Sequence, residues 1–510
     1  MGAMGDPFSN TDRDVFLIKV ERQIDRGALL SRYSRASALD IREVYRKEFE
    51  NDPERGPDFY RRVFMEYGDE SVSELVTVQM AVQNVSNVVS KFIEEQRIGL
   101  SYLEKSTRYV RYSVKRDGRY LYADPDRAGI QQSLSGDYEQ ACDLLFETYS
   151  DLEEPLYRLA GARYPLEEQV FQVGTETMNV DAMSEGERKA ARRAYERALR
   201  ARVLDDIRFL LPASTLTNVG ISGNGRALTY LIQRLRSSAL REARELASSI
   251  YGELKGELPN LIDAAVNRHG ERLTKYISGI SSMMEPVAPG AGEDVRLLSC
   301  PDEAAFGRHL FSAMKSAGLV PRGARDLPEL AERISSMRMD RRDKLPRPFE
   351  LARYDFTMNI SFGAFRDVQR HRFLTLLRGY LNTDCGYVVP ELIASDEQAR
   401  LRFVEAMETA ASVHRKIRDV QGPQVAQYCV PFAFRYPVFI STNLRELCFF
   451  MELRTSEQTH YEIRRALREL YRQVSERTPI LASMMKFVDT REHGLGRLRA
   501  EMRKEANSGN

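Results

Sequence analysis

The sequence has little of what marks several common classes of protein. It contains only five cysteines in 510 residues and no Cys-x-x-Cys pair, which predicts reduced thiols in a cytoplasmic protein, without a disulfide framework or a metal site. It has no apolar run long enough to cross a membrane. The formal net charge of +1 gives the whole molecule no strong field to attract nucleic acid or an anionic membrane.

Several catalytic motifs are also missing. The chain has no Gly-rich phosphate loop, no Gly-x-Ser-x-Gly elbow and no His-Glu-x-x-His. Dinucleotide folds of the Rossmann type, P-loop enzymes, α/β-hydrolases and zinc peptidases therefore have no support. Because the net charge is close to zero, any anion site must be a local cluster of arginines.

What is present favours a helix-rich α+β protein of two or three domains, with 43% hydrophobic and 29% charged residues. Apolar positions three and four residues apart predict many helices. We expect them at residues 38–50, 58–67, 71–97, 136–160, 185–210, 226–256, 258–283, 324–337, 397–419, 444–455 and 459–486. The best strand candidates are 107–113, 354–361 and 386–389.

The two halves of the chain contain a repeated pattern. Asn-x-Arg-x-Leu begins at Asn224 and again at Asn443, and a proline stands twelve residues earlier in both cases. Each copy leads into a helix with Glu-x-Arg, which begins at Glu242 in the first half and at Glu462 in the second. Each copy also follows a charged tripeptide, at residues 96–98 and 370–372. Recurrence in the same order predicts a tandem duplication. Proline and glycine over 284–293 favour a linker, so we predict repeats over 1–283 and 298–510, joined by 284–297.

Three polar segments are candidates for a site, each with a simpler alternative. Ser106 and Arg108 suit a phosphate, although a surface turn with a capping serine and a solvated arginine is the simpler explanation. Arg370-His371-Arg372, beside Asp367, suits a nucleotide or a diphosphate, although it could be an ordinary charged face.

The third segment begins at Asn443 and Arg445. Arg454 lies eleven residues after Asn443, about three helical turns, so both share one face of a helix with Gln458 beyond them. This alignment suggests a lined cleft. A buried ion pair of Arg454 with Glu452 or Glu457 is the alternative.

Together these segments resemble the flavin-dependent thymidylate synthases. That family carries Arg-His-Arg-x-x-Ser-x-Asn-Glu-x-Ser-x-Arg-Tyr, followed by Ala-Arg-x-x-Leu-Pro and Asn-x-Arg-x-Leu. The first half of this chain keeps only the later part of the long motif, at Ser101, Glu104, Ser106, Arg108 and Tyr109, and it also keeps Arg208 before Leu211-Pro212. It departs from the family at Gln96-Arg97-Ile98, at Leu103 in place of Asn, and at Asp69 in place of an upstream His.

The second half keeps the complementary part. Arg370-His371-Arg372 is intact, and the matching positions further along are Glu350, Asn443, Arg445 and Arg454. The Glu, Ser and Arg of the loop are replaced by Arg378, Tyr380 and Asn382, and the Arg before Leu-Pro is replaced by Gln427. Random decay would not be expected to spare matching partners on opposite halves.

The resemblance implies a deoxyuridylate site built between two repeats, of which this chain retains one. The implied dUMP ligands are Glu104, Lys105, Ser106, Arg108, Arg208, Asp367, Arg370 and Arg454. The implied FAD ligands are Glu350, Arg370, His371, Arg372, Asn443, Arg445 and Phe449. Arg454 would be the catalytic residue, because it would stabilise charge developing on the pyrimidine.

The implied reaction is the reductive methylation of dUMP to dTMP by FAD, with NADPH and methylenetetrahydrofolate as co-substrates. The alternatives are a flavin- and nucleotide-binding paralogue with an altered substrate, or one with no catalytic activity. The family forms tetramers of single-repeat chains, so the resemblance further implies a homodimer with a four-repeat core. Each repeat is expected to hold a small antiparallel sheet with long helices, and no nucleic acid or membrane partner is expected.

Overall fold

The computed structural model describes residues 6–37, 40–63, 71–285, 287 and 292–508. The chain divides into two compact units. Unit 1 comprises Met1–Lys105, Ala123–Gln131 and Leu216–Glu285, and unit 2 comprises Ser106–Tyr122, Gln132–Thr215 and Pro286–Asn510. The units cut across the predicted repeats, because segments 106–122 and 132–215 of the first repeat pack with the second. The repeat boundaries themselves stay a prediction about sequence.

Unit 1 is built on a three-stranded antiparallel sheet in the order β1-β5-β2. Its strands are β1 (Thr77–Ser86), β2 (Leu100–Glu104) and β5 (Leu216–Asn224). Buried and more exposed residues alternate along β5, as expected for a strand with one face on a core. The helices of this unit are α1 (Gln23–Tyr33), α2 (Ile41–Glu48), α3 (Arg55–Arg62), η2 (Ser71–Leu75), α4 (Asn87–Glu94), α5 (Pro125–Ala128), α8 (Gly225–Arg236), α9 (Arg241–Glu257), η6 (Ile262–Ala265) and α10 (Arg268–Ser282).

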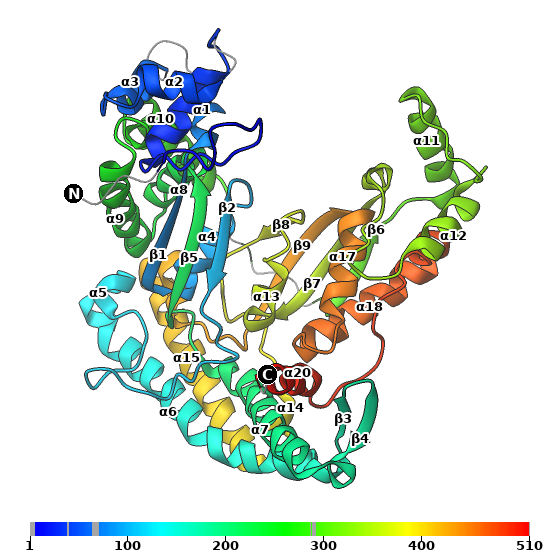
Figure 1. Ribbon diagram of the computed structural model, residues 1–510. Coiled ribbons are helices and arrows are strands. Elements are labelled where there is room, and N and C mark those ends of the chain that lie inside the picture. The colour runs from blue at the N-terminus through cyan, green and yellow to red at the C-terminus, as the bar shows by residue number, and fades with distance from the viewer. Residues whose placement is uncertain (1–5, 38–39, 64–70, 286, 288–291, 509–510) are drawn as a thin grey trace. The chain divides into compact units, whose positions relative to one another are not determined.

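Unit 2 contains a four-stranded antiparallel sheet in the order β6-β7-β9-β8 (Figure 1). The strands are β6 (Val295–Ser299), β7 (Arg353–Ser361), β8 (Thr375–Arg378) and β9 (Arg435–Asn443). Helices α17 (Leu444–Arg454) and α18 (Tyr461–Arg477) pack against this sheet. Short elements around it are α11 (Glu303–Ser316), α12 (Leu327–Met337), η7 (Arg347–Leu351), α13 (Phe362–Val368) and α19 (Pro479–Ala482).

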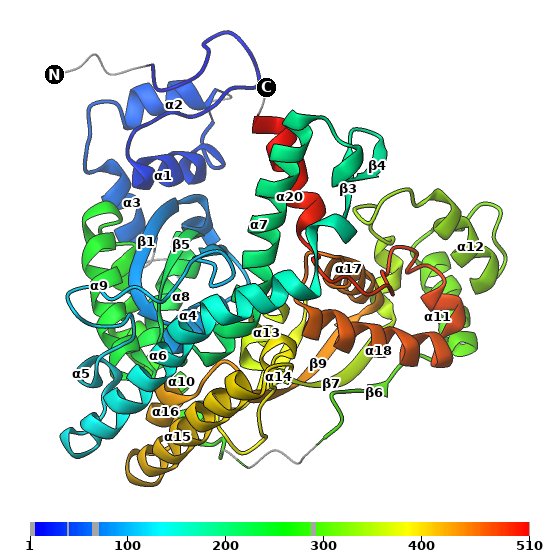
Figure 2. The ribbon, with the colours of Figure 1, turned by 90° about the horizontal axis from the view of Figure 1, so that it is seen from below.

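Long helices form the rest of unit 2. Helix α6 (Gln132–Arg163) packs against α7 (Glu185–Ile207) and α15 (Glu397–Gln421), and α20 (Leu498–Ser508) lies alongside α7 (Figure 2). The hairpin of β3 (Val170–Val173) and β4 (Glu176–Asn179) contacts α20 through β3. The remaining elements are η3 (Leu166–Glu168), η4 (Val180–Ala182), η5 (Arg208–Leu210), α14 (Glu391–Ala394), α16 (Pro423–Ala426) and η8 (Gln427–Cys429). No helix in the described ranges combines the length and apolar character needed to span a bilayer.

The same strand-to-helix corner occurs in both repeats. Ser86 ends β1 and caps α4, where its hydroxyl accepts from Val89 N–H, while its own N–H and hydroxyl donate to Glu242 at 2.8 and 2.6 Å. Ser361 ends β7 and caps α13, and donates in the same way to Glu462 at 2.7 and 2.6 Å. A strand-to-helix corner tied to a later helix is thus present twice, which explains the glutamate of the recurring Glu-x-Arg.

Within unit 2, equivalent segments of the two repeats pair with each other. Pro212 forms an antiparallel bridge with Pro431. Ala213 N–H donates to Val430 O at 2.8 Å, and Phe432 N–H donates to Leu211 O at 2.9 Å. The two bonds are equivalent, because the donor of each occupies the same position in its repeat and so does the acceptor. A local two-fold axis therefore passes between the two prolines.

The predicted class, helix-rich α+β with small antiparallel sheets, is confirmed. Strand 354–361 is confirmed as β7, but 107–113 is wrong, because residues 107–109 form a turn. Of 386–389, only Tyr387 pairs, through one bridge to Phe434.

The helix predicted over 71–97 is wrong in its middle, where β1 lies. Val78, Met80 and Val82 fit a period of two as well as a helical one, and pairing with β5 decides between them. Strand β5 itself was hidden by its glycines, and a Cβ on Gly223 would clash with the Leu100 side chain of β2.

Several predicted helices have different bounds. The stretch 226–256 is two helices, α8 and α9, and 459–486 is α18 followed by α19. Only 268–282 of the segment 258–283 is α-helical, as α10. Residues 38–39 and 64–70, which include Asp69, lie outside the described residues.

Candidate active site

A cavity of about 600 Å³ opens in unit 2 where α17 begins. It lies within the size range of small-molecule and cofactor sites. It is lined by Lys344, Arg347, Glu350, Arg370, His371, Arg372, Phe373, Asn443, Arg445, Glu446, Phe449, Leu453 and Arg454. The structure therefore gathers all seven residues that the resemblance assigns to FAD, together with Arg454.

The strand-to-helix corner at Asn443 positions one wall of this cavity. Asn443 ends β9, and its side chain caps α17 by accepting from Glu446 N–H at 2.9 Å. Two residues on, Arg445 donates to Leu345 O at 2.7 Å and pairs with Glu350 at 3.2 Å. These contacts fix the guanidinium group at the start of the helix.

The lining of the cavity is strongly cationic. Six lining side chains are lysine or arginine and two are glutamate. Phe449 and Leu453 add an apolar surface. This combination suits a ligand with a flat aromatic part and a phosphate-bearing part.

Polar contacts connect the cavity to its floor. Arg454 Nε–H donates to His371 Nε2 at 3.0 Å, and its Nη1 lies 3.6 Å from Asp367 Oδ1. Since Nε2 accepts, Nδ1 carries the proton and donates to Glu446 Oε1 at 3.0 Å. Burial, helped by Arg454, lowers the pKa of His371 despite Glu446, so the imidazole is neutral at pH 7.

The turn at 106–109 carries a second set of charges in unit 2. Arg108 forms a two-pronged ion pair with Asp205 at 2.6 and 2.8 Å and donates to Gln458 O at 3.2 Å. Its own N–H donates to Ser106 Oγ at 3.3 Å. Although burial opposes ionisation of Asp205, Arg108 and Arg497 hold the pKa of this carboxyl well below its usual range.

Arg208 is almost completely buried beside this pair. It is 3% exposed, donates to Gly363 O at 3.3 Å, and its Nε–H has no hydrogen-bond partner among the described residues. Burial, reinforced by the neighbouring Arg108, lowers the pKa of Arg208 to about 10, so the side chain remains charged at neutral pH. A buried, partly unsatisfied guanidinium group is costly unless an anion binds to it.

Asp367 links the two sets of charges. Burial raises its pKa, but Arg108 and Arg454 outweigh this effect, with help from Arg370 and Arg208, and the net pKa lies below its usual value. The neighbouring Arg366 donates to Thr107 Oγ1 at 3.0 Å, which ties the turn to α13. One carboxylate, that of Asp367, thus interacts electrostatically with arginines of both repeats. Arg108 and Arg208 of the first repeat are predicted to bind the nucleotide, and Arg454 of the second is the predicted catalytic residue.

Sequence comparisons show which family the chain belongs to. A model of the family described as thymidylate synthase complementing protein matches residues 22–260 and 314–480, one segment in each half of the chain. The chain belongs to this family. The predicted family and its tandem form are confirmed.

Two kinds of relative are similar to this member of the thymidylate synthase complementing family. UPF0159 protein Ta1429 of Thermoplasma acidophilum is 44% identical over 95% of this chain and 99% of that protein. A UPF0159 protein of Chlamydia muridarum is 34% identical over 98% of this chain and 96% of that protein. A flavin-dependent thymidylate synthase of Geobacter sulfurreducens is 32% identical over 95 residues, 18% of this chain and 41% of that protein.

Two of the residues assigned to dUMP by the family resemblance lie in unit 1. Glu104 is buried, accepts from Lys91 at 2.7 Å and from Ser90 at 3.1 Å. The Lys105 N–H donates to Asn218 O at 2.9 Å. Their part in nucleotide binding therefore stays a prediction.

Three charged residues of this family member's site were missed by the sequence analysis. Asp205 lies one helical turn before Arg208, which was a usable signal, and Glu446 lies next to Arg445. Arg497 lies in the C-terminal segment of the chain, where no motif was recognised.

The first repeat has no arginine at the position that corresponds to Arg454. Eleven residues after the cap Asn224, the position equivalent to Arg454 is Leu235, which is fully buried. The preceding residue, Arg234, pairs with Glu95 at 2.8 Å. The pair of Arg226 with Glu74 at 2.9 Å does recur, as Arg445 with Glu350.

Proposed function

We propose that this chain is a flavin-dependent thymidylate synthase with one composite site, which methylates dUMP reductively to dTMP in the cytoplasm. The observation that carries the proposal is the convergence of Arg108, Arg208 and Arg454 on Asp367, next to a cationic cavity. Two arginines of one repeat and one of the other survive as neighbours, while the reciprocal position holds Leu235.

The cavity fits FAD on its own chemistry. Arg370, Arg372 and Arg445 would hold the diphosphate, and Phe449 would pack against an aromatic ring. The pair of Glu350 with Arg445 fixes that arginine before binding. When bound, the flavin would supply the hydride that NADPH delivers to it, and methylenetetrahydrofolate would supply the one-carbon unit.

The chain's own residues would bind and polarise the nucleotide. Ser106, Arg108 and Arg208 would hold its phosphate through charge-assisted hydrogen bonds. Arg454 would face the pyrimidine, where its charge stabilises the negative charge that develops as C5 becomes nucleophilic. Neutral His371 accepts from Arg454 and so fixes the orientation of the guanidinium group.

Three measurements test the proposal. The purified protein should carry a yellow chromophore with flavin absorbance, and NADPH with methylenetetrahydrofolate should convert dUMP to dTMP. Expression should also relieve the thymidine requirement of a strain without thymidylate synthase. Protein that takes up no flavin on reconstitution with FAD, and makes no dTMP, would refute it.

A flavin- and nucleotide-binding protein without turnover is a second candidate. It is favoured by the ion pair of Arg108 with Asp205, because a phosphate must compete with a carboxylate already in place. Bound flavin and measurable dUMP binding without dTMP formation would identify this case. An altered substrate would be indicated if flavin reduction depended on another nucleotide.

We further propose that two chains associate into the four-repeat core of the family. A molar mass of two chains by light scattering is expected. A monomer at micromolar concentration would contradict the dimer without affecting the composite site.

A further inference from the structure

The last part of the chain lies beyond the segment shared with the family model, which ends at residue 480. This C-terminal arm, residues 487–497, leads from α19 to α20 within unit 2. No sequence motif was found in this arm. Its course brings one arginine to the site described above.

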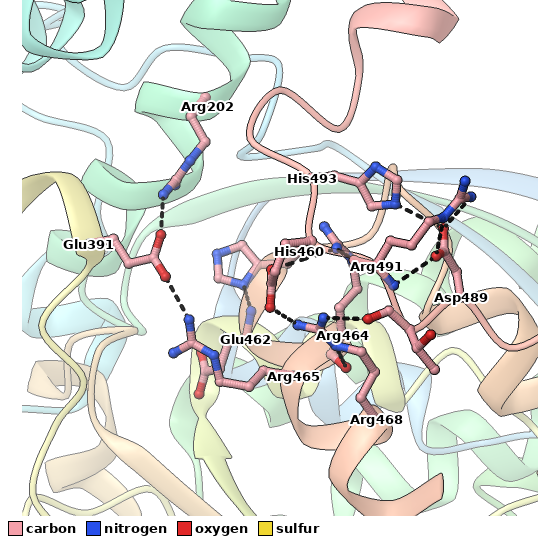
Figure 3. A network of polar contacts seen from close by, with 12 residues as sticks. Arg202, Glu391, His460, Glu462, Arg464, Arg465, Arg468, Asp489, Arg491 and His493 are labelled. Carbon is pink, nitrogen blue, oxygen red and sulfur yellow. Dashed lines mark hydrogen bonds and ion pairs between the residues drawn. The ribbon is translucent and has the colours of Figure 1, made fainter. Parts of the chain in front are cut away.

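The arm is held against α18 by the network in Figure 3. Arg464 donates to Arg491 O at 2.8 Å, and Arg468 donates to Thr490 O at 3.0 Å. Asp489 pairs with His493 at 2.8 Å and also binds Arg491. The arm therefore has a defined path.

Helix α20 holds the other end of the arm on α7. Glu505 pairs with Arg193 at 2.6 Å, and Glu501 pairs with Arg197 at 3.0 Å. Arg499 donates to Gln172 of β3 at 2.6 Å. Ion pairs before and after residue 497 thus fix its position along the chain.

Arg497 points from this fixed position into the turn that carries Arg108. It is 6% exposed, and its Nη1 donates to Arg108 O at 3.4 Å. Its guanidinium carbon lies 4.4 Å from the ring centre of Tyr109, a cation–π contact. Its Nη2 lies 3.6 Å from Asp205 Oδ1 and is buried without a hydrogen-bond partner among the described residues.

The charges around Asp205 do not balance within unit 2. Arg108, Arg208, Arg454 and Arg497 lie around Asp205 and Asp367, and Arg208 also interacts with Glu462, which leaves at least one positive charge in excess before Arg366 and Arg370 are counted. A phosphate monoester carries a charge of about −1.5 to −2 at pH 7. A ligand of that charge would remove the imbalance.

We propose that Arg497, delivered by the C-terminal arm, is a further phosphate-binding residue of the composite nucleotide site. Its unsatisfied Nη2 and the unsatisfied Nε of Arg208 are two donors that an oxyanion would accept from. The inference rests on the proposed function for the identity of the nucleotide, but not for the phosphate.

The test compares Arg497→Ala with Arg499→Ala. Arg499 is an exposed arginine two residues further on, and its side chain donates to Gln172 of β3. Isothermal titration should show dUMP binding about 10- to 100-fold weaker in Arg497→Ala, the loss expected for a charge-assisted hydrogen bond. Deoxyuridine, which lacks the phosphate, should bind equally to all three proteins. Arg497→Lys should recover part of the lost dUMP affinity, because it restores a positive charge without the planar fork.

A merely structural arginine would behave differently. Equal weakening of dUMP and deoxyuridine in Arg497→Ala would overturn the inference, as would unchanged binding of both. If the wild-type protein binds no dUMP, inorganic phosphate becomes the probe. Thermal stabilisation by phosphate that is lost in Arg497→Ala and kept in Arg499→Ala would support phosphate binding by Arg497, even though dUMP would not be the substrate. If phosphate does not stabilise the wild type, the inference about Arg497 is overturned.

Discussion

Pro212 pairs with Pro431, its own counterpart one repeat later in the chain. The bonds beside this bridge are reciprocal, since Ser214 N–H donates to Tyr428 O and Ala433 N–H donates to Phe209 O, both at 3.0 Å. Such self-complementary pairing is the mark of a two-fold interface between identical subunits. Here the same geometry joins two segments of one chain, which is the structural trace of the duplication.

The first prediction concerns Arg454. Arg454→Ala should lower the rate of dTMP formation at least about 10²- to 10³-fold, because it removes the donor expected to stabilise charge on the pyrimidine. Circular dichroism and cooperative unfolding should stay close to wild type. Arg472→Ala, on the exposed face of α18, is the matched control and should retain full activity. Retained turnover in Arg454→Ala would show that the catalytic assignment is wrong.

The second prediction concerns Asp205. Asp205→Asn leaves Arg108 and Arg497 without their carboxylate, so the free energy of unfolding should fall by about 3–5 kcal/mol, the range for a broken buried ion pair. Urea unfolding measures this loss. Added phosphate should stabilise the variant more than the wild type, since it replaces the missing charge.

The exposed pair of Asp137 with Lys416 provides the control for Asp205. Asp137→Asn should change stability by less than about 1 kcal/mol. If both variants lost the same free energy of unfolding, the buried ion pairs of Asp205 would stabilise the protein no more than an exposed ion pair does.

The third prediction tests the repeated corner. Glu242→Gln and Glu462→Gln each leave one donor of Ser86 or Ser361 facing an amide N–H₂ group. Each should cost about 1–3 kcal/mol, and the two losses should be similar. Chemical denaturation gives both values. A large cost in one repeat and none in the other would contradict the equivalence of the corners.

The fourth prediction concerns His414, which is fully buried on α15 with its Nδ1 3.1 Å from Thr383 Oγ1. Burial, with a smaller contribution from Arg418, lowers its pKa to about 4. The unfolded chain therefore takes up this proton near pH 6.5 and the folded chain only near pH 4. Stability from this group is complete above pH 6.5 and declines as the pH falls toward 4, by up to about 3 kcal/mol.

Comparison with His414→Gln isolates that contribution. The decline in the free energy of unfolding between pH 7 and pH 4.5 should be smaller in the variant than in the wild type. Identical pH profiles would show that His414 does not titrate as the structure indicates.

Much of the site could be predicted because its residues lie at short sequence distances from turns and helix caps. Asn443 fixes where α17 begins, so the face shared with Arg454 followed from helical spacing alone. The ion-pair alternative was partly right in kind, because Arg454 does meet a carboxylate, but its partner is Asp367 rather than Glu452 or Glu457. Glu452 is instead paired with Arg338 at 2.6 Å.

The strands were harder to predict, because pairing partners far apart in sequence decide them. Glycine is uncommon inside strands, yet Gly220 and Gly223 both lie in β5 and pair with β2. The position of Arg497 could not be predicted for a similar reason. Nothing local to residues 487–497 indicates that α18 and α7 hold both ends of that arm.

The reciprocal bonds between 209–214 and 428–433 have a consequence for how the site is maintained. Subunits that meet through such an interface separate on dilution, and a pocket shared between them disappears with them. Here a covalent chain keeps the two partners at a high effective concentration at any level of expression. Each half was then free to change by itself, so that one holds Leu235 in place of an arginine while the other has different residues in place of the Glu, Ser and Arg of its loop.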